Sequence, residues 1–198
     1  MAERGKTARD QDPWICFEDE AGQSLRPPKV PPGTHPVITV TGKGSGRVSV
    51  AGLICLKPGQ RTRLIYRILL HRGRRSEPKG FREVDYALLL DAAHQQLGGP
   101  IVLVWDNLTT YRDALMRRLI ASRPWLTVFY LPAYAPELNP TEGVWAHLKR
   151  SLGNLAPATL DQLASLVRSR LKRMQYRPAL LEAFIAHTGL TLTSEAAP

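Results

Sequence analysis

Two short apolar runs, at residues 101–105 and 126–131, form the clearest hydrophobic pattern in the chain. Each run has the length of a buried β-strand, and the segment between them is expected to hold a helix. A proline-rich turn follows the second run and leads into a further helix that carries Glu142. Asp106 directly follows the first run. Since open α/β sheets place their chemistry at the carboxyl ends of strands, both acids are candidate functional residues.

The remaining segments predict strands before residue 71 and mainly helices after it. Residues 14–17 are an apolar run that ends in the acids Glu18, Asp19 and Glu20, and residues 22–36, with five prolines and two glycines, are predicted to be a loop. The β-rich segments 37–41 and 48–56 flank a glycine-rich turn and predict a β-hairpin. A further strand is expected at 63–70, and helices are expected at 84–97, 159–173 and 178–187.

This order of elements predicts an α/β fold, a ribonuclease-H-like mixed five-stranded sheet flanked by helices. In that layout the first and fourth strands are neighbours, so the acids at their carboxyl ends, Asp19 and Asp106, would meet. We expect a disordered tail at residues 1–12, one domain at 13–188 and a loose C-terminal tail at 189–198.

Composition adds an anionic partner to this picture. The chain has 198 residues, a formal net charge of +10 and a pI of about 10.1, which favours nucleic acid as the partner over a merely soluble basic protein. Nine residues between 57 and 82 are Lys or Arg, and one is acidic. The basic residues predicted to contact DNA phosphates are Arg61, Arg63, Arg72, Arg74, Arg75, Lys79, Lys149 and Arg150.

Localisation follows from what the chain lacks in sequence. No apolar run approaches the ~20 residues of a membrane span, and residues 1–13 contain no hydrophobic segment typical of a secretory signal. Cys16 and Cys55 lie in apolar, strand-like runs without metal-ligand spacing, so we expect reduced core residues. A cytoplasmic protein without a membrane partner is the simplest expectation.

Carboxylates gathered at one sheet edge repel each other unless a cation neutralises them. Hard divalent cations such as Mg²⁺ take carboxylate, water and phosphate oxygens as ligands. Two such ions can activate an attacking oxygen and stabilise a leaving oxygen in phosphoryl transfer. A basic chain with convergent acids therefore indicates metal-assisted cutting or joining of a phosphodiester backbone.

Each candidate also has a plain structural interpretation. Glu142 stands three residues after Asn139 with a proline between them, which is also the position of a capping-box glutamate. Asp106 could form an Asx turn. Residues 18–20 could be a solvated strand end, and periodicity does not identify which of these three acids faces a site. Trp145 is predicted to be a core residue rather than a base-stacking platform, and a surface or packing role is favoured for His147.

Three motifs resemble a known family. Residues 17–22 (FEDEAG), 104–107 (VWDN) and 131–150 (LPAYAPELNPTEGVWAHLKR) resemble the catalytic domain of DDE transposases, in particular the bacterial insertion-sequence branch of the mariner superfamily. The third motif is the most specific of the three. The resemblance extends from about residue 14 to about residue 188, and 35 residues separate Asp106 from Glu142, close to the family's spacing.

The resemblance implies a ribonuclease-H-like fold and two divalent metal ions, magnesium or manganese, held by Asp19, Asp106 and Glu142. It implies supporting roles for Glu20 and Asn107. The implied reaction is nicking at transposon ends followed by attack of the freed 3′-hydroxyl on target DNA. A homodimer would fit the need to cut two ends together, and a separate N-terminal half would supply the DNA-binding modules that the family places before the first Asp.

Three departures from the family pattern keep a second hypothesis open. Tyr111 stands where the family usually has His, and the loop after Pro28 is shorter and lacks the usual Trp. Only about a dozen residues precede Trp14. The alternative is an inactive transposase remnant that at most binds DNA through its basic surface.

Overall fold

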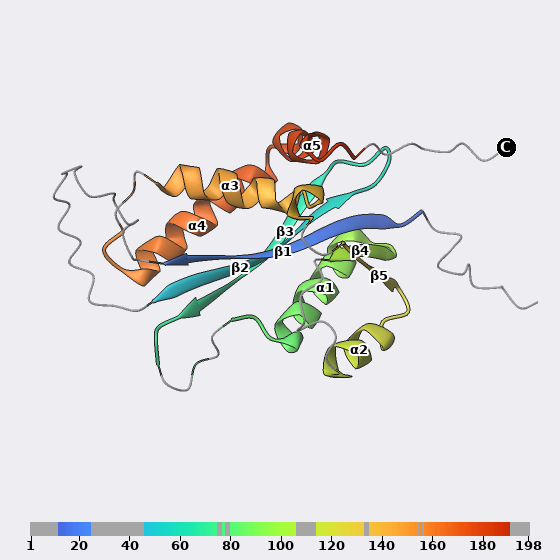
Figure 1. The fold of residues 1–198 in the computed structure, drawn as a ribbon, viewed down its shortest axis with the longest axis horizontal. Helices are drawn as coiled ribbons and strands as arrows, with labels where there is room; N and C mark the ends of the chain where they lie inside the picture. The colour runs from blue at the N-terminus through green and yellow to red at the C-terminus, as the bar shows by residue number, and fades with distance from the viewer. Residues whose placement is uncertain are drawn as a thin grey trace, which may run out of the picture.

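The computed structural model describes residues 12–24, 46–74, 77, 80–105, 114–132, 135–153, 155 and 157–190. Their core is one five-stranded sheet with helices on both faces (Figure 1). The strands are β1 (Trp14–Ser24), β2 (Arg47–Leu56), β3 (Arg63–His71), β4 (Ile101–Trp105) and β5 (Leu126–Tyr130). The helices are α1 (Glu83–Leu97), α2 (Ala114–Ala121), the short 3-10 helix η2 (Pro136–Leu138), α3 (Thr141–Leu152), α4 (Leu160–Gln175) and α5 (Pro178–His187).

The sheet order is β3-β2-β1-β4-β5, which is a mixed sheet of the ribonuclease-H-like type. The first three strands pair antiparallel, and β4 runs parallel to both β1 and β5. The predicted fold class and the predicted adjacency of the first and fourth strands are therefore confirmed. The β1–β4 register ends at the pair Phe17↔Val104, so the carboxyl end of β4 lies beside the acidic part of β1.

The prediction that the first strand ends at its acids is wrong. β1 continues through Glu18, Asp19 and Glu20 to Ser24, and it pairs with β2 as far as Ser24↔Arg47. The first residues of the predicted loop 22–36 therefore belong to the strand. Three consecutive acids have low β-propensity, but pairing along the whole of β2 overrides that local preference.

The predicted hairpin between residues 37–41 and 48–56 is also wrong. β2 hydrogen-bonds to β1 along one edge and to β3 along the other, and its residues from Val48 to Cys55 are paired on both sides. Residues 37–41 lie outside the described part of the chain. The glycine-rich turn favoured the nearest strand-like segment in sequence as the partner of β2. In the structure that edge of β2 pairs instead with β1, which lies further away in sequence.

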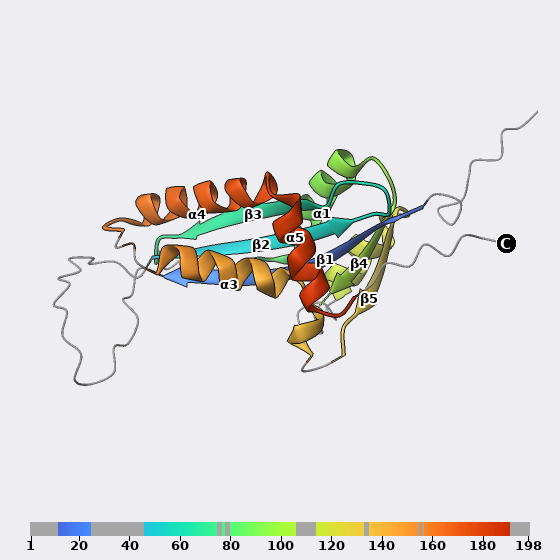
Figure 2. The ribbon, with the colours of Figure 1, turned by 90° about the horizontal axis from the view of Figure 1, so that it is seen from above.

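Helices α3, α4 and α5 cover one face of the sheet, and α1 and α2 cover the other (Figures 1 and 2). The first face buries Phe17 and Val50 against Leu148 and Val167. The second buries Cys16 and Leu53 together with side chains of α1. Because successive side chains of a strand point to opposite faces, each layer of helices meets its own set of β1 residues.

Helix boundaries agree closely with the periodicity of the sequence. Helix α1 differs by one residue at its start from the predicted 84–97, and α5 has the predicted bounds. The Thr159 side chain caps α4 by accepting a hydrogen bond from the amide of Gln162 at 3.2 Å. Gly98 ends α1 with a φ of 68°, a left-handed conformation that favours glycine.

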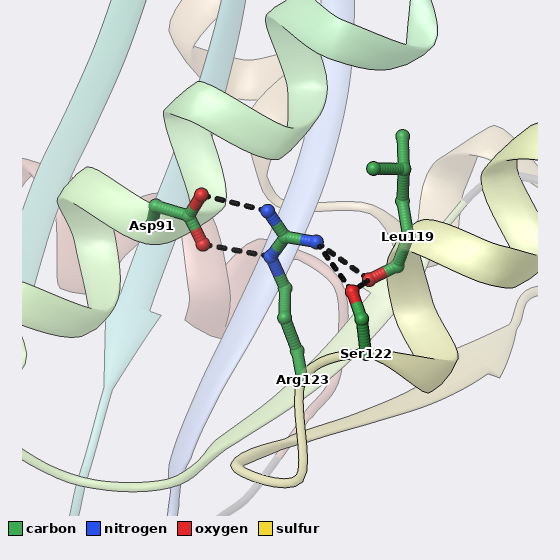
Figure 3. Close-up of polar contacts among 4 residues, drawn as sticks. All are labelled: Asp91, Leu119, Ser122 and Arg123. Atoms are coloured by element: carbon green, nitrogen blue, oxygen red, sulfur yellow. Dashed lines mark hydrogen bonds and ion pairs between the residues drawn. The ribbon is translucent and has the colours of Figure 1, made fainter.

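An ion pair ties α1 to the corner between α2 and β5 (Figure 3). Arg123 donates from Nε and Nη2 to the two carboxylate oxygens of Asp91, both at 2.7 Å, and from Nη1 to the Leu119 carbonyl at 2.6 Å. These contacts raise the pKa of the Arg123 guanidinium, with the hydrogen bond to Asp91 as the largest cause. This bidentate ion pair holds α1 and α2 together on the face of the sheet opposite α3.

The two cysteines are free and buried, as expected. Cys16 and Cys55 are cross-strand partners in β1 and β2, and burial raises the pKa of the Cys16 thiol. Among the described residues, no helix combines the length and the apolar character needed to cross a membrane.

Candidate active site

Strand β1 carries three consecutive acids, and the structure separates them by face. Asp19 accepts a hydrogen bond from Trp145 of α3, whereas Glu20 accepts one from the Tyr86 hydroxyl of α1 at 2.9 Å. Glu18 is buried, with 1% of its surface exposed, and strand alternation places it on the same face as Glu20. Asp19 is therefore the acid of this trio that faces α3, the helix that carries Glu142.

The segment before Glu142 holds the start of α3 against the backbone of β1. Asn139 Nδ2 donates to the Glu18 carbonyl at 2.8 Å, and Thr141 Oγ1 donates to the Phe17 carbonyl at 2.8 Å. Asn139 Oδ1 also accepts from the Thr141 amide at 3.1 Å. Both polar side chains are buried, where a hydrogen bond is costly to lose. These bonds place Glu142, the next residue in the chain, at the same edge as Asp19.

The capping-box interpretation of Glu142 is wrong. The backbone amide that a capping glutamate would bind, that of Asn139, donates instead to the Pro136 carbonyl at 2.9 Å. Helix α3 begins at Thr141 with Pro140 at the N-cap position. Glu142 is exposed, and its carboxylate accepts no hydrogen bond from any described residue. A carboxylate so placed keeps all its oxygen lone pairs for a ligand.

Trp145 connects Asp19 to the helix that carries Glu142. It is 1% exposed, as expected for a core residue, and its indole Nε1 donates to Asp19 Oδ2 at 2.9 Å. The other oxygen, Asp19 Oδ1, accepts from the Glu20 amide at 2.8 Å. Trp145 also lies three residues after Glu142, one turn along the same helix. The sequence carries one signal for this contact. A buried indole N–H needs a hydrogen-bond acceptor, and Trp145 stands three residues after Glu142.

Gly52 makes room for the Trp145 ring. It is the cross-strand partner of Asp19 in β2. A Cβ added at Gly52 would lie 2.8 Å from Trp145 Cη2 and 3.2 Å from its Cζ2, closer than carbon atoms pack. A residue with any side chain here would displace the indole that binds the carboxylate.

We therefore expect Gly52→Ala to cost about 1–3 kcal/mol of unfolding free energy, as overpacking in a core does. The displaced ring should also lose its hydrogen bond to Asp19, which would shift the Trp145 indole N–H signal in a ¹H–¹⁵N spectrum. Gly99→Ala is the matched control, because its Cβ would meet Trp14 at an ordinary 3.8 Å. Equal urea midpoints and unchanged indole signals for Gly52→Ala and the parent chain would contradict this account.

The second predicted acid, Asp106, lies outside the described residues, as do Asn107 and Tyr111. The last described residue before it, Trp105, is fully buried and packs edge-on against Tyr86 with ring centroids 5.4 Å apart. Within the described ranges, no group of three or more His, Cys, Asp or Glu side chains is arranged to hold a metal ion.

His147 lies on α3 beyond Glu142 and packs beside Phe184 of α5, with ring centroids 6.0 Å apart. The packing role expected for it is thus seen. Burial lowers the pKa of His147, and the nearby charges of Arg150 and Arg177 lower that pKa further.

The predicted phosphate contacts near β3 divide into two groups at its opposite ends. Arg61 and Arg63 lie at its start, and Arg72 and Arg74 follow its last residue. At about 3.3 Å per residue, the nine-residue strand separates the two groups by roughly 30 Å. The described members of the predicted contacts in region 57–82 therefore lie in two separate groups.

Most of these arginines have intramolecular partners. Arg61 and Arg63 donate to the carbonyls of Gln175 and Gln96, at 3.3 and 2.9 Å, and Arg63 also lies 5.5 Å above the Trp14 ring. Arg72 forms an ion pair with Asp161 at 2.8 Å, which raises the pKa of its guanidinium.

The other predicted contacts differ in their surroundings. Arg74 is exposed, while Arg75 and Lys79 lie outside the described residues. Lys149 and Arg150 are exposed on α3, and Arg150 Nε donates to the Ala146 carbonyl at 3.3 Å. These two are the predicted contacts nearest in sequence to Glu142.

Comparison with solved structures shows the same fold in mariner transposases. The Mos1 strand transfer complex matches with a TM-score of 0.55 at 16% identity, over 90% of this chain and 56% of that one. The catalytic domain of Mos1 mariner transposase matches with a TM-score of 0.51 at 14% identity, over 90% of this chain and 84% of that one. The Mos1 catalytic domain with raltegravir and magnesium matches with a TM-score of 0.51 at 13% identity, over 90% of this chain and 85% of that one.

Two further findings concern sequence. No curated protein matches the chain. The family model of the DDE superfamily endonucleases matches residues 15–164, which is more than half of the chain and includes β4, α3 and all of β1 except its first residue. The chain therefore belongs to the DDE superfamily endonucleases.

Proposed function

We propose that this chain is a transposase catalytic domain that cleaves DNA strands and transfers them to a target, using Asp19, Asp106 and Glu142. The observation that carries the proposal is the geometry around Trp145, which binds Asp19 and lies one turn from Glu142. This geometry supports a site shared by two acids that are more than 120 residues apart in the chain. The parallel pairing of β1 and β4 supports the third, because Asp106 directly follows Trp105 at the end of β4.

The donor set fits divalent metal ions. Asp19 and Glu142 offer carboxylate oxygens, the ligands that Mg²⁺ and Mn²⁺ prefer, and Glu142 is exposed to solvent. With Asp106 they would hold two ions, which supply Lewis-acid stabilisation to the attacking and leaving oxygens. Mos1 structures that contain magnesium and others that contain manganese support the choice of ions.

The chain's own residues have distinct parts in this function. Trp145 orients Asp19 by binding one of its oxygens, and Asn139 and Thr141 hold the start of α3 so that Glu142 keeps its position. In cleavage, a water oxygen attacks the phosphorus and the 3′-oxygen leaves as a hydroxyl. In transfer, that 3′-hydroxyl attacks a phosphorus of the target strand, and the target's own 3′-oxygen leaves.

DNA is the proposed partner, as transposon ends and as target. Mos1 structures described as paired-end and strand transfer complexes support it. The chain spans 56% of the Mos1 chain in the strand transfer complex. A homodimer, which would cut two transposon ends together, and a separate N-terminal DNA-binding half belong to the proposal as well.

The test is nicking of labelled duplex DNA that carries candidate element ends, in magnesium or manganese. We expect metal-dependent cleavage that is absent in Asp106→Asn. Cleavage that persists in Asp106→Asn would remove this residue from the site. An absence of cleavage by the parent chain, with salt-sensitive DNA binding retained and a candidate N-terminal half added, would favour the inactive remnant.

A further inference from the structure

A basic pocket lies among α3, α4 and the start of α5, outside the proposed metal site. Its volume is about 200 Å³, and the residues that line it are His147, Ser151, Arg170, Arg173, Met174 and Arg177. The lining contains three arginines and no acid. Figure 2 shows α5 crossing the sheet face that α3 and α4 cover.

The arginines reach this pocket from two helices. Arg170 and Arg173 are three residues apart in α4, which places them on one face near its end. Arg177 is the N-cap residue of α5, and a turn holds it beside α4, because its amide donates to the Met174 carbonyl at 2.9 Å. Met174 is 2% exposed, and Arg170 is half-buried beside it. The charges therefore converge on a concave surface instead of spreading around the helix.

No acid in the described part of the chain forms an ion pair with these arginines. The ion pairs formed by the described residues are those of Arg67, Arg72 and Arg123, none of which lines the pocket. The Ser151 hydroxyl donates to the Leu148 carbonyl at 2.8 Å, which leaves its oxygen as an acceptor. Positive charge from Arg150 and Arg177 also acts on His147. Like charges gathered in this way are stabilised when an anion binds among them.

We propose that this pocket binds one backbone phosphate of the DNA strand that enters the proposed active site. Guanidinium groups present paired donors that match phosphate oxygens. The volume lies below the roughly 300–1,000 Å³ of sites for whole small molecules, so a phosphate group fits better than a nucleotide. The proposal rests on the proposed function only in taking DNA as the ligand.

The position of the pocket relative to Glu142 supports this assignment. His147 and Ser151 are five and nine residues beyond Glu142, or about 7.5 and 13.5 Å along the helix axis. At 3.6 residues per turn they lie on the other flank of α3, and the exposed Ala146 and Arg150 lie between the two flanks. A strand bound at Glu142 can therefore reach the pocket by crossing this exposed ridge.

The test compares two double variants of the full chain that each remove two positive charges from α4. Arg170→Gln/Arg173→Gln empties the pocket of two arginines, and Arg168→Gln/Lys172→Gln removes two exposed charges outside it. Binding to a mixed-sequence duplex is measured by fluorescence anisotropy across a range of salt concentrations, without divalent metal. Thermal unfolding of each variant verifies that it is folded.

We expect the pocket variant to lower the slope of log K against log salt by about 0.9, the value for one lost phosphate contact, and the control to keep the parent slope. Equal slopes in all three proteins, or equal losses in both variants, would overturn the proposal. Inorganic phosphate is the second probe, followed through the His147 ring signals. Saturation by inorganic phosphate together with an unchanged DNA slope would assign the pocket to a free anion and overturn the DNA assignment.

The same comparison in an Asp19→Asn background separates this proposal from the proposed function. The Asp19→Asn chain is not expected to cleave DNA. If the pocket variant still lowers the salt slope in this chain, the phosphate pocket is supported whatever the outcome of the nicking assay. If the parent chain cleaves DNA and the pocket variant has the parent salt slope, the proposed function is supported and the phosphate pocket is contradicted.

Discussion

Replacement of Asp19 by asparagine is expected to abolish metal-dependent DNA cleavage while leaving the fold intact. Asparagine has the same shape, and its amide oxygen can still accept the hydrogen bond that Trp145 Nε1 donates at 2.9 Å. The negative charge that would hold a metal ion is lost. A metal ion contributes several kcal/mol of transition-state stabilisation, so we expect cleavage to fall by about 10³-fold or more.

The measurement is the rate of nicking of labelled duplex in magnesium, beside urea unfolding of the same preparation. Glu83→Gln is the control, since it removes one carboxylate from the first turn of α1, on the other face of the sheet. We expect Asp19→Asn to lower the free energy of unfolding by only about 1 kcal/mol, because the amide has one accepting oxygen and therefore keeps one of the two hydrogen bonds that Asp19 accepts from Trp145 and from the Glu20 amide. Full activity of Asp19→Asn would show that this carboxylate is not a metal ligand and would remove the basis of the proposed site.

Trp145→Phe is expected to lower cleavage by about 10–100-fold, as loss of a group that orients a metal ligand commonly does. Phenylalanine keeps an aromatic ring in the core but cannot donate a hydrogen bond to Asp19 Oδ2. We therefore class Trp145 as a positioning residue. Its loss should weaken the apparent affinity for magnesium more than the affinity for DNA, since the ring touches the carboxylate and packs in the core.

Trp125→Phe is the matched control for this substitution. Trp125 is half-buried and stacks on His94 with ring centroids 4.1 Å apart, against the opposite face of the sheet. A merely structural role for Trp145 would lower stability without changing the magnesium dependence of cleavage. A parent-like magnesium dependence for Trp145→Phe would therefore contradict the positioning role.

Gly52 and Trp145 should behave as one unit. The indole can reach Asp19 because the cross-strand partner of Asp19 has no side chain. Residues in direct contact show non-additive effects, so the cost of Gly52→Ala should shrink when position 145 holds the smaller phenylalanine. This links a glycine with no chemistry of its own to the orientation of a proposed ligand.

The sequence by itself determined the secondary structure wherever the hydrophobic period was strong. The run at 101–105 is β4 as predicted, and α1 and α5 begin and end within one residue of their predicted bounds. The adjacency of the first and fourth strands also followed from the order of elements, because this order has few compact solutions. Those features depend on local burial and on chain connectivity, both of which can be read from the order of residues.

The tertiary structure alone decided which face of the sheet each acid of β1 takes. Alternation along β1 shows that neighbouring acids face opposite ways, but the choice of Asp19 for the α3 face depends on pairing with β2 and β4. The bond from Trp145 and the space left by Gly52 join three elements that lie far apart in the chain. The gathering of α4 arginines beside His147 depends in the same way on packing between helices. Packing between elements that are distant in sequence sets the directions of these side chains, so the local sequence does not predict them.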